Sequence, residues 1–261
     1  MLFNQKFKVH TSKAGSAAIA WLGQSGYLLK SPGGVRIVID PYLSDSLSKD
    51  EKFPLPRLKP PLLKAEDLEV DLFLCTHSHP DHADFETLEV ASKNKASIFA
   101  APGGTQEILE KAGVDKAKRE IFWPGREMRL EDVTIQTTFA VPTDASDLSP
   151  VGYLLSVDNG PKLFFCGDTD NHPLLAKAND FQPDVMFVCI NGTFNNLSHW
   201  EAAELSAALK TKIAVPCHYG MFENNTIDPH QFKSALQSLN PEIVYKEFEY
   251  GEIWDYQGDG K

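Results

Sequence analysis

Short apolar runs with the length of strands dominate the beginning of the chain. Those at 18–22, 26–30 and 35–40 predict an opening meander of strands. From residue 70 onward, such runs alternate with segments of helical periodicity. The predicted strands there are 70–76, 96–100, 119–123, 127–130, 132–140, 151–157, 161–166, 184–190, 212–217 and 242–248, and the predicted helices are 84–94, 103–112, 200–210 and 228–239. Strands first, with helices interleaved later in two similar halves, predict an α/β fold of paired sheets with helices outside.

Residues 41–66 interrupt this pattern. The segment holds five prolines and many charges, which makes it too irregular for a helix or strand and too apolar for a free linker. Long loops of this kind are usually functional, and we expect a substrate loop or a lid here. Since the chain shows no repeat of fixed period and no convincing linker, we expect residues 1–261 to form a single domain.

The chain carries a net charge of −11, and its lysines and arginines are scattered. This pattern disfavours nucleic acid as a partner and leaves a small-molecule substrate, because a metal and a few local cations can reverse the potential within one cleft. No run approaches the ~18–20 apolar residues of a membrane span, and the first ten residues lack the apolar core of a signal peptide. We therefore expect a cytoplasmic protein with free cysteines. Homo-oligomerisation stays open.

The stretch THSHPDHAD, residues 76–84, follows the apolar run 70–75 directly. His77 and His79 lie two positions apart in an extended segment, so their side chains leave the same face and can converge on one ion. Asp81 and His82 follow after a proline, in a turn that can present them to a second ion about 3.5–4 Å from the first. So many coordinating groups favour a metal site over a surface loop whose histidines cap the next helix.

Other motifs follow in the same order as in a known superfamily. FFCGDT (164–169) and IAVPCHYG (213–220) are apolar strands that end in an aspartate and a histidine, and WLGQSG and IDPY open the chain. Together with THSHPDHAD they resemble the metallo-β-lactamase superfamily. The resemblance implies a four-layer αββα sandwich of two mixed sheets. It also implies that Asp168 bridges two metals, that His218 completes the second site, and that Asp40 holds the metal-bearing loop from behind.

One expected ligand is missing. Most members of the superfamily place a histidine after the strand that corresponds to 132–140, whereas this chain reads VPTDA at 141–145. Asp144 or a water is the evident substitute beside His77 and His79, while Asp81, His82, Asp168 and His218 form a complete set for one ion. More oxygen and less imidazole shift the preference from Zn²⁺ toward Mn²⁺, so we expect one or two divalent ions of either kind.

The missing histidine makes the chain resemble one group within the superfamily more than the others. The chain is most similar to the L-ascorbate-6-phosphate lactonase group, in which that histidine is also absent and the last motif reads much like VPCHYGMFENNTIDP. This similarity implies hydrolysis of a sugar-acid lactone through metal-activated water, with Asp81 or Asp168 handling the proton. His172, four residues after Asp168, is a candidate proton donor or a surface histidine. No serine-nucleophile signature competes with this interpretation.

Further side chains are candidates for substrate binding. Arg57 and Lys59 in the proline-rich segment are the candidate contacts of a substrate phosphate. Hydroxyl recognition by neutral hydrogen bonds suits Asn191, Thr193, Asn195 and Asn196. Tyr219 is a further candidate for substrate binding. The alternative for this asparagine-rich stretch is a loop that leads into a helix capped by Ser198 and Glu201.

Two other functions remain open at this stage. The same ligands would serve a metal-dependent phosphodiesterase acting on a small or lipid phosphodiester. A non-catalytic binding protein that keeps the fold is the second alternative, because one expected ligand is missing.

Overall fold

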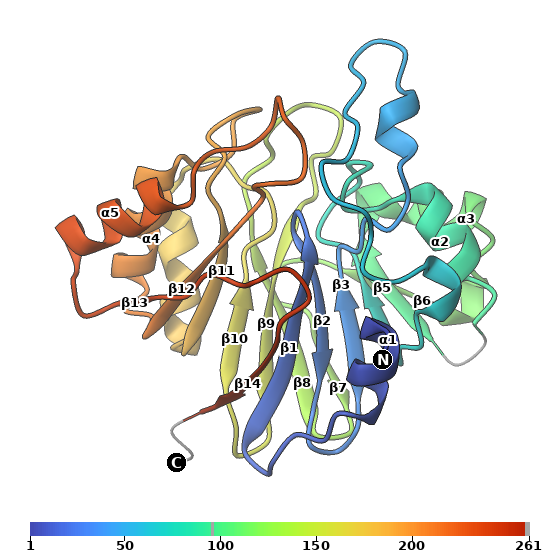
Figure 1. Cartoon of the computed structure of the whole chain (residues 1–261), viewed down its shortest axis with the longest axis horizontal. Helices are drawn as coiled ribbons and strands as arrows, with labels where there is room; N and C mark the ends of the chain where they lie inside the picture. Colours follow the sequence, from blue (N-terminus) through green and yellow to red (C-terminus); the bar gives the residue numbers. More distant parts are fainter. Residues whose placement is uncertain (95–96, 259–261) are drawn as a thin grey trace.

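The computed structural model describes residues 1–94 and 97–258. Within these ranges two seven-stranded sheets face each other, and helices cover the outer face of each (Figure 1). The strand order is β14-β1-β2-β3-β4-β5-β6 in the first sheet and β13-β12-β11-β10-β9-β8-β7 in the second. The predicted α/β fold of two mixed sheets flanked by helices is confirmed.

The elements have the following bounds. The first sheet contains β1 (Ser16–Gly23), β2 (Gly26–Lys30), β3 (Arg36–Ile39), β4 (Leu72–Leu74), β5 (Ile98–Pro102), β6 (Arg119–Phe122) and β14 (Ile253–Gln257). The second contains β7 (Glu127–Leu130), β8 (Val133–Phe139), β9 (Val151–Val157), β10 (Lys162–Phe165), β11 (Val185–Cys189), β12 (Ile213–Cys217) and β13 (Val244–Tyr245). The α-helices are α1 (Phe3–Val9), α2 (Phe85–Ala91), α3 (Gln106–Lys111), α4 (His199–Ala208) and α5 (His230–Leu239). Short 3₁₀ helices are η1 (Ser46–Lys49), η2 (Ala65–Asp67), η3 (Gly103–Thr105), η4 (Lys116–Lys118) and η5 (Pro173–Phe181).

Each sheet is antiparallel in one half and parallel in the other. Strands β3 to β6 pair in parallel in the first sheet, and β10 to β13 do so in the second. The carboxyl ends of parallel strands meet at one edge of a sheet, where α/β proteins place their ligands. The loops that follow β3, β4, β10, β11 and β12 therefore emerge at one end of the molecule (Figure 1).

The strands near the centre of the first sheet are buried on both faces. Along β1, Ile19 and Trp21 face the second sheet, while Ala20 and Leu22 pack against the helical layer that includes α1, α2 and α3. All eight residues of β1 are buried. Burial of both faces explains why the sequence shows continuous apolar runs here rather than the alternation of a half-exposed strand.

Aromatic side chains join the two sheets. Tyr27 of the first sheet packs edge-on against Phe187 of the second, with ring centroids 4.6 Å apart. Tyr153 of β9 donates its hydroxyl hydrogen to the carbonyl of Cys75, at 2.8 Å. This hydrogen bond fixes the end of β4 immediately before the THSHPDHAD loop.

Helix α1, helix η5 and strand β14 were not predicted from the sequence. Helix α1 has only one buried residue, Phe7, so its apolar face is too small to show a periodic signal. Helix η5 is a 3₁₀ helix, and β14 is an edge strand with no buried residue. The predicted strand 242–248 is reduced to β13, and residue 96 of the predicted strand 96–100 lies outside the described ranges.

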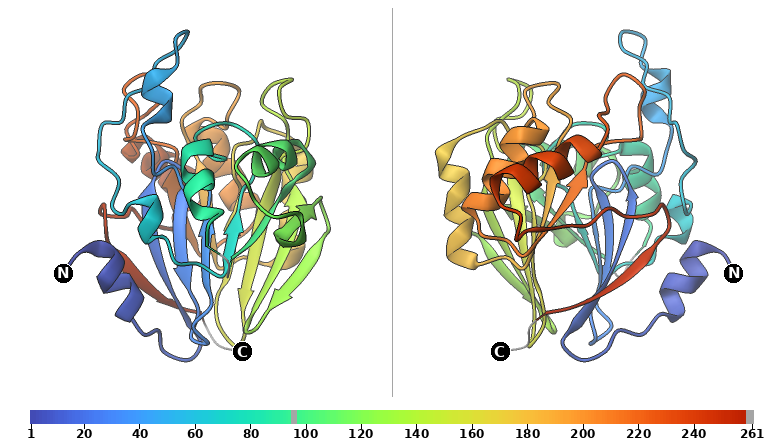
Figure 2. Two further views of the ribbon diagram at one scale, coloured as in Figure 1. Left: turned by 90° about the vertical axis from the view of Figure 1, so that its right-hand side faces the viewer. Right: turned by 60° about the vertical axis from the view of Figure 1, so that its left-hand side comes forward.

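Segment 41–66 is irregular apart from η1 and η2, as its prolines predict. Its η1 end projects beyond the edges of both sheets (Figure 2). Within residues 1–94 and 97–258, every helix is too short or too polar to cross a bilayer.

Candidate metal centre

The THSHPDHAD loop begins where β4 ends. The amide nitrogens of His82 and Ala83 both donate to the carbonyl of His79, at 2.9 and 2.8 Å, and this tight turn places Asp81 and His82 side by side. Asp84, the last residue of the loop, is not part of the cluster, because its carboxylate accepts hydrogen bonds from Ser44.

Asp40 lies behind this loop, directly after β3. One carboxylate oxygen accepts the backbone N–H of Thr76 at 2.7 Å, and the other accepts the Thr76 hydroxyl at 2.6 Å and lies 2.8 Å from Nδ1 of His82. An imidazole that donates from Nδ1 has its lone pair on Nε2. Asp40 thereby turns Nε2 of His82 toward the aspartates of the cluster.

Two aspartates and two histidines from both sheets meet at this edge. Nε2 of His82 lies 3.3 Å from Asp168 and 3.6 Å from Asp81. Nε2 of His218 lies 3.1 Å from Asp168 and 3.4 Å from Asp81. The four residues come from the loops after β4, β10 and β12, so residues far apart in the sequence form one cluster.

The other two histidines of the loop lie beside this group. His77 is buried, with its ring centroid 4.1 Å from that of His82. His79 is more exposed, and its Nε2 lies 3.2 Å from a carboxylate oxygen of Asp144 and 3.2 Å from the Ser146 hydroxyl. The structure therefore brings Asp144 to His79, at the exposed rim of the cluster.

The donor atoms fit a divalent cation. Within the described residues, two groups of three have their donor atoms within 4.8 Å of one another: His77, His82 and Asp168, and Asp81, His82 and His218. In the first group Nε2 of His77, Nε2 of His82 and Oδ1 of Asp168 are buried without any hydrogen-bond partner. Buried polar atoms without partners are costly, and a cation would satisfy all three at once.

The charges of the cluster alter the pKa values of its members. Burial and the neighbouring His82 lower the pKa of His77 to about 3, so this imidazole is neutral and ready to coordinate. Burial alone would also lower the pKa of His218, but the carboxylates of Asp168 and Asp81 outweigh it and raise that pKa to about 10. The same contacts with His218 and His82 overcome burial and hold the pKa of Asp168 well below its usual range.

These pKa values predict proton release on metal binding. A histidine must be neutral to coordinate, whereas His218 carries a proton in the metal-free protein at neutral pH. We expect metal affinity to rise with pH up to about pH 10, with protons released as the ion binds. Titration calorimetry in buffers of different ionisation enthalpy measures this release. Binding heats that do not depend on the buffer would contradict the prediction.

Gly167 permits close contact between the two loops that carry Thr76 and Asp168. Its φ is +64°, and a Cβ at this position would lie within 3.0 Å of the Thr76 side chain. We expect Gly167→Ala to displace Asp168 and to weaken metal binding by roughly 10-fold, with a loss of about 1–3 kcal/mol of stability. Gly125→Ala is the matched control, because Gly125 also has a positive φ but no atom within 4 Å of the added Cβ. Equal effects of the two variants on a chelator competition assay would contradict this prediction.

The predicted proton donor and the predicted phosphate contacts have other partners. Nδ1 of His172 accepts the N–H of Leu174 and so caps η5. The Arg57 guanidinium donates to the carbonyls of Tyr42, Ser44 and Lys59 within segment 41–66. The Lys59 ammonium lies over aromatic rings of Trp21 and Tyr250. These contacts give structural roles to all three side chains.

The predicted hydroxyl-binding residues also contact protein groups. Asn191 donates to Asn225 at 2.8 Å, and Asn195 donates to the carbonyl of Thr143 at 2.7 Å. Tyr219 is buried and stacks on Trp21 at 4.9 Å. Ser198 and Glu201 form a capping box at the start of α4, as the alternative interpretation of this stretch predicts.

Two amides at the cluster were not predicted as members of the site. Gln24, in the turn between β1 and β2, donates to Asp81, and Asn196, in the loop after β11, donates to Asp168. Gln24 lies within WLGQSG, at a strand end on the same sheet edge as Asp40. This position could have predicted Gln24 as a member of the site. Asn196 was considered only for hydroxyl recognition.

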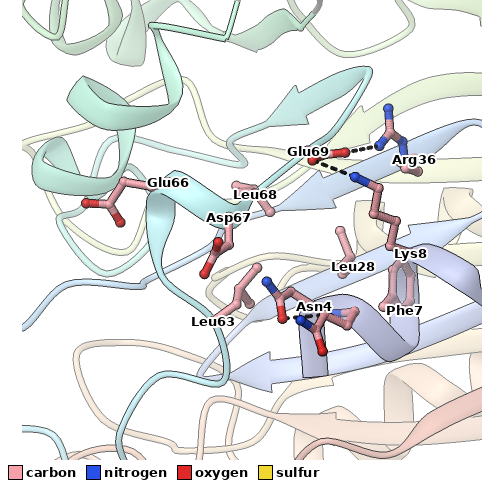
Figure 3. A pocket seen from close by; sticks show the side chains of 11 residues that line it. Asn4, Phe7, Lys8, Leu28, Arg36, Leu63, Glu66, Asp67, Leu68 and Glu69 are labelled. Atoms are coloured by element: carbon pink, nitrogen blue, oxygen red, sulfur yellow. Dashed lines mark hydrogen bonds and ion pairs between the residues drawn. The ribbon is translucent and has the colours of Figure 1, made fainter. Parts of the chain in front are cut away.

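A separate cavity of about 200 Å³ lies between α1, η2 and strands β2 and β3 (Figure 3). Phe7, Leu28 and Leu68 line it, and Glu69 at its rim pairs with Lys8. It contains none of the cluster residues. Because the reactive groups lie at the opposite sheet edge, this cavity is not the candidate active site.

The fold is that of the metallo-β-lactamases, because two mixed sheets flanked by helices face each other. The histidines and aspartates at one sheet edge form a candidate metal centre. The family model described as "Beta-lactamase superfamily domain" matches residues 18–218. A UPF0173 metal-dependent hydrolase of Myxococcus xanthus is 32% identical over 89% of this chain and 83% of its own length. The chain therefore belongs to the metallo-β-lactamase superfamily and, within it, to the UPF0173 metal-dependent hydrolases.

Other similar proteins support this family assignment. A UPF0173 metal-dependent hydrolase of Thermodesulfovibrio yellowstonii is 28% identical, over 88% of this chain and 89% of its own length. The structure of Igni18, a metallo hydrolase from Ignicoccus hospitalis, superimposes with a TM-score of 0.73 at 22% identity, covering 94% of this chain and 100% of that one. The predicted superfamily and hydrolase class are confirmed, and the lactonase group stays a prediction.

Proposed function

We propose that this metal-dependent hydrolase opens a small, uncharged lactone. The observation that carries the proposal is the cluster at the sheet edge, in which, among the described residues, two groups of three have donor atoms within 4.8 Å of one another and three buried donor atoms lack a hydrogen-bond partner. The groups are His77, His82 and Asp168, and Asp81, His82 and His218. Each group would hold one ion, with His82 common to both, whereas His79 and Asp144 pair with each other at the exposed rim and belong to neither group. The donor set of imidazoles and carboxylates suits Mn²⁺ or Zn²⁺.

The side chains of the cluster suit the activation of a water molecule, and none of them is suited to act as the nucleophile. The hydroxyl of Thr76 is used in its bond to Asp40. The Cys217 thiol is next to His218 in the sequence, but burial raises its pKa well above the usual value, so it stays protonated. Water is therefore the proposed nucleophile.

A bound divalent ion would polarise the lactone carbonyl and lower the pKa of water. We assign the proton of the attacking water to Asp81, whose side chain is 14% exposed against 6% for Asp168. Water adds to the carbonyl carbon, the ring C–O bond breaks, and the proton held by Asp81 passes to the leaving alkoxide, which gives a hydroxy acid. Asp168, which contacts both His82 and His218, stays ionised.

The contacts of Arg57 and Lys59 support an uncharged substrate. Both cations predicted to bind a phosphate are engaged with backbone carbonyls or aromatic rings of the protein. This arrangement supports an uncharged lactone over a phosphorylated one. It equally weakens the case for a phosphodiester substrate.

The test compares two substrates on protein loaded with Mn²⁺ or Zn²⁺. We expect turnover of a neutral sugar lactone, followed by acid release, and little turnover of bis(p-nitrophenyl) phosphate. Turnover of the phosphodiester alone would replace the proposal with a phosphodiesterase. Metal binding without turnover of either compound would favour a non-catalytic binding protein.

A further inference from the structure

Gln24 lies fully buried between two of the proposed ligands. Its Nε2 donates to Oδ2 of Asp81 at 2.8 Å and lies 3.0 Å from Nε2 of His218. Its backbone carbonyl accepts the indole N–H of Trp21 at 2.9 Å and the N–H of His218 at 3.0 Å. These bonds fix the residue in a left-handed conformation with φ of +52°. Strained backbone held this firmly is typical of functional positions.

Asn196 makes the corresponding contact on the second sheet. Its Nδ2 donates to Oδ2 of Asp168 at 2.6 Å, and the residue is 6% exposed. The preceding residues Phe194 and Asn195 both have left-handed backbones, with φ of +55° and +59°. Asn195 anchors this turn to the carbonyl of Thr143. The loop is therefore shaped so that Asn196 reaches the carboxylate.

We propose that Gln24 and Asn196 are positioning residues that hold the two metal-ligand carboxylates through single amide N–H bonds. Each amide binds the Oδ2 atom that faces His218, which lies 3.4 Å from Asp81 and 3.1 Å from Asp168. A carboxylate oxygen can accept this bond and still offer a lone pair to an ion. The two amides thus set the rotation of both carboxylates about the same histidine.

The chemistry of an amide suits this task. A lysine or arginine would also bind a carboxylate, but its positive charge would repel the cation that the carboxylate must hold. A neutral N–H fixes the ligand without that repulsion. Moreover, Oε1 of Gln24 and Oδ1 of Asn196 are buried without a hydrogen-bond partner.

The inference rests on the proposed ligand roles of Asp81 and Asp168 and not on the identity of the substrate. Its test is therefore metal affinity, measured by chelator competition with Mn²⁺ and Zn²⁺, together with the visible absorption of Co²⁺-loaded protein. We expect Gln24→Met and Asn196→Leu each to weaken binding by roughly 10–100-fold and to shift the Co²⁺ bands.

Gln136→Met and Asn171→Leu are the matched controls. Both remove an amide that donates to a carboxylate outside the cluster, that of Glu127 or Glu201. We expect wild-type affinity and an unchanged Co²⁺ spectrum for both. If Gln24→Met does not fold, as judged by circular dichroism, Gln24→Asn withdraws the amide by one methylene and serves in its place.

Wild-type affinity and spectrum in the folded Gln24 and Asn196 variants would overturn the inference. Failure of the ligand assignment itself is distinguishable. In that case Asp168→Asn would also keep wild-type metal affinity, whereas failure of the inference alone leaves the aspartate variant defective.

Discussion

Replacement of Asp168 by asparagine is expected to reduce metal affinity by more than about 100-fold and to abolish hydrolysis, with the fold retained. The substitution keeps the shape of the side chain but removes the negative charge that lies 3.3 Å from His82 and 3.1 Å from His218. It also removes an ionised carboxylate that could coordinate a metal ion beside both groups of candidate ligands. Elemental analysis after dialysis, together with circular dichroism, measures the effect.

Asp170→Asn is the control for this experiment. Asp170 is exposed in the same loop and accepts only the N–H of Asn171 through its side chain among the described hydrogen bonds. We expect it to retain metal and activity. An Asp168→Asn protein with the metal content of this control would refute the ligand role of Asp168.

Asp40→Asn is expected to destabilise the metal-free protein by about 2–4 kcal/mol and to weaken metal binding by roughly 10–100-fold. An asparagine amide accepts hydrogen bonds only at its oxygen, because its nitrogen is a donor. One of the buried donors of Thr76 and His82 therefore loses its partner. Asparagine is the informative replacement, because Asp40 has a φ of +46° and asparagine tolerates a left-handed backbone. A loss caused by backbone strain is thereby avoided.

Urea unfolding and chelator competition measure the two effects separately. Asp40→Ala is expected to lose at least as much stability, since it removes both acceptors and adds strain at a positive φ. Unchanged metal affinity in the folded Asp40→Asn protein would show that the bond to His82 does not orient that imidazole.

The sequence was sufficient to predict the sheets and the centre of the cluster. Apolar runs ending in Asp168 or His218 indicate strands that deliver polar groups to one sheet edge, and the structure brings both residues to His82. The rule works because strand direction, and not loop conformation, determines where these residues lie. It also places Asp40 directly behind the motif.

Loop-borne residues were harder to predict. Asn196 reaches Asp168 only because left-handed residues turn its loop, and such conformations are not encoded by apolar periodicity. Arg57 and Lys59 suggest an anion site by residue type, but Arg57 donates to carbonyls of segment 41–66, and the Lys59 ammonium lies over the rings of Trp21 and Tyr250. Tyr219 follows a ligand in the sequence, yet its ring packs on Trp21 in the interior. Each of these outcomes depends on contacts between distant segments.

The cluster joins groups that belong to different sheets, since Asp81 and His82 follow β4 whereas Asp168 and His218 follow β10 and β12. An ion held by these groups would act as a cross-link across the sandwich, comparable to a disulfide that closes a long loop. Ligand binding that is restricted to the folded state adds about 2.7 kcal/mol when the free ion is at 100 times its Kd. Metal supply would therefore control the lifetime of the folded chain as well as its chemistry. The metal-free protein would be degraded by proteases before the metal-bound protein.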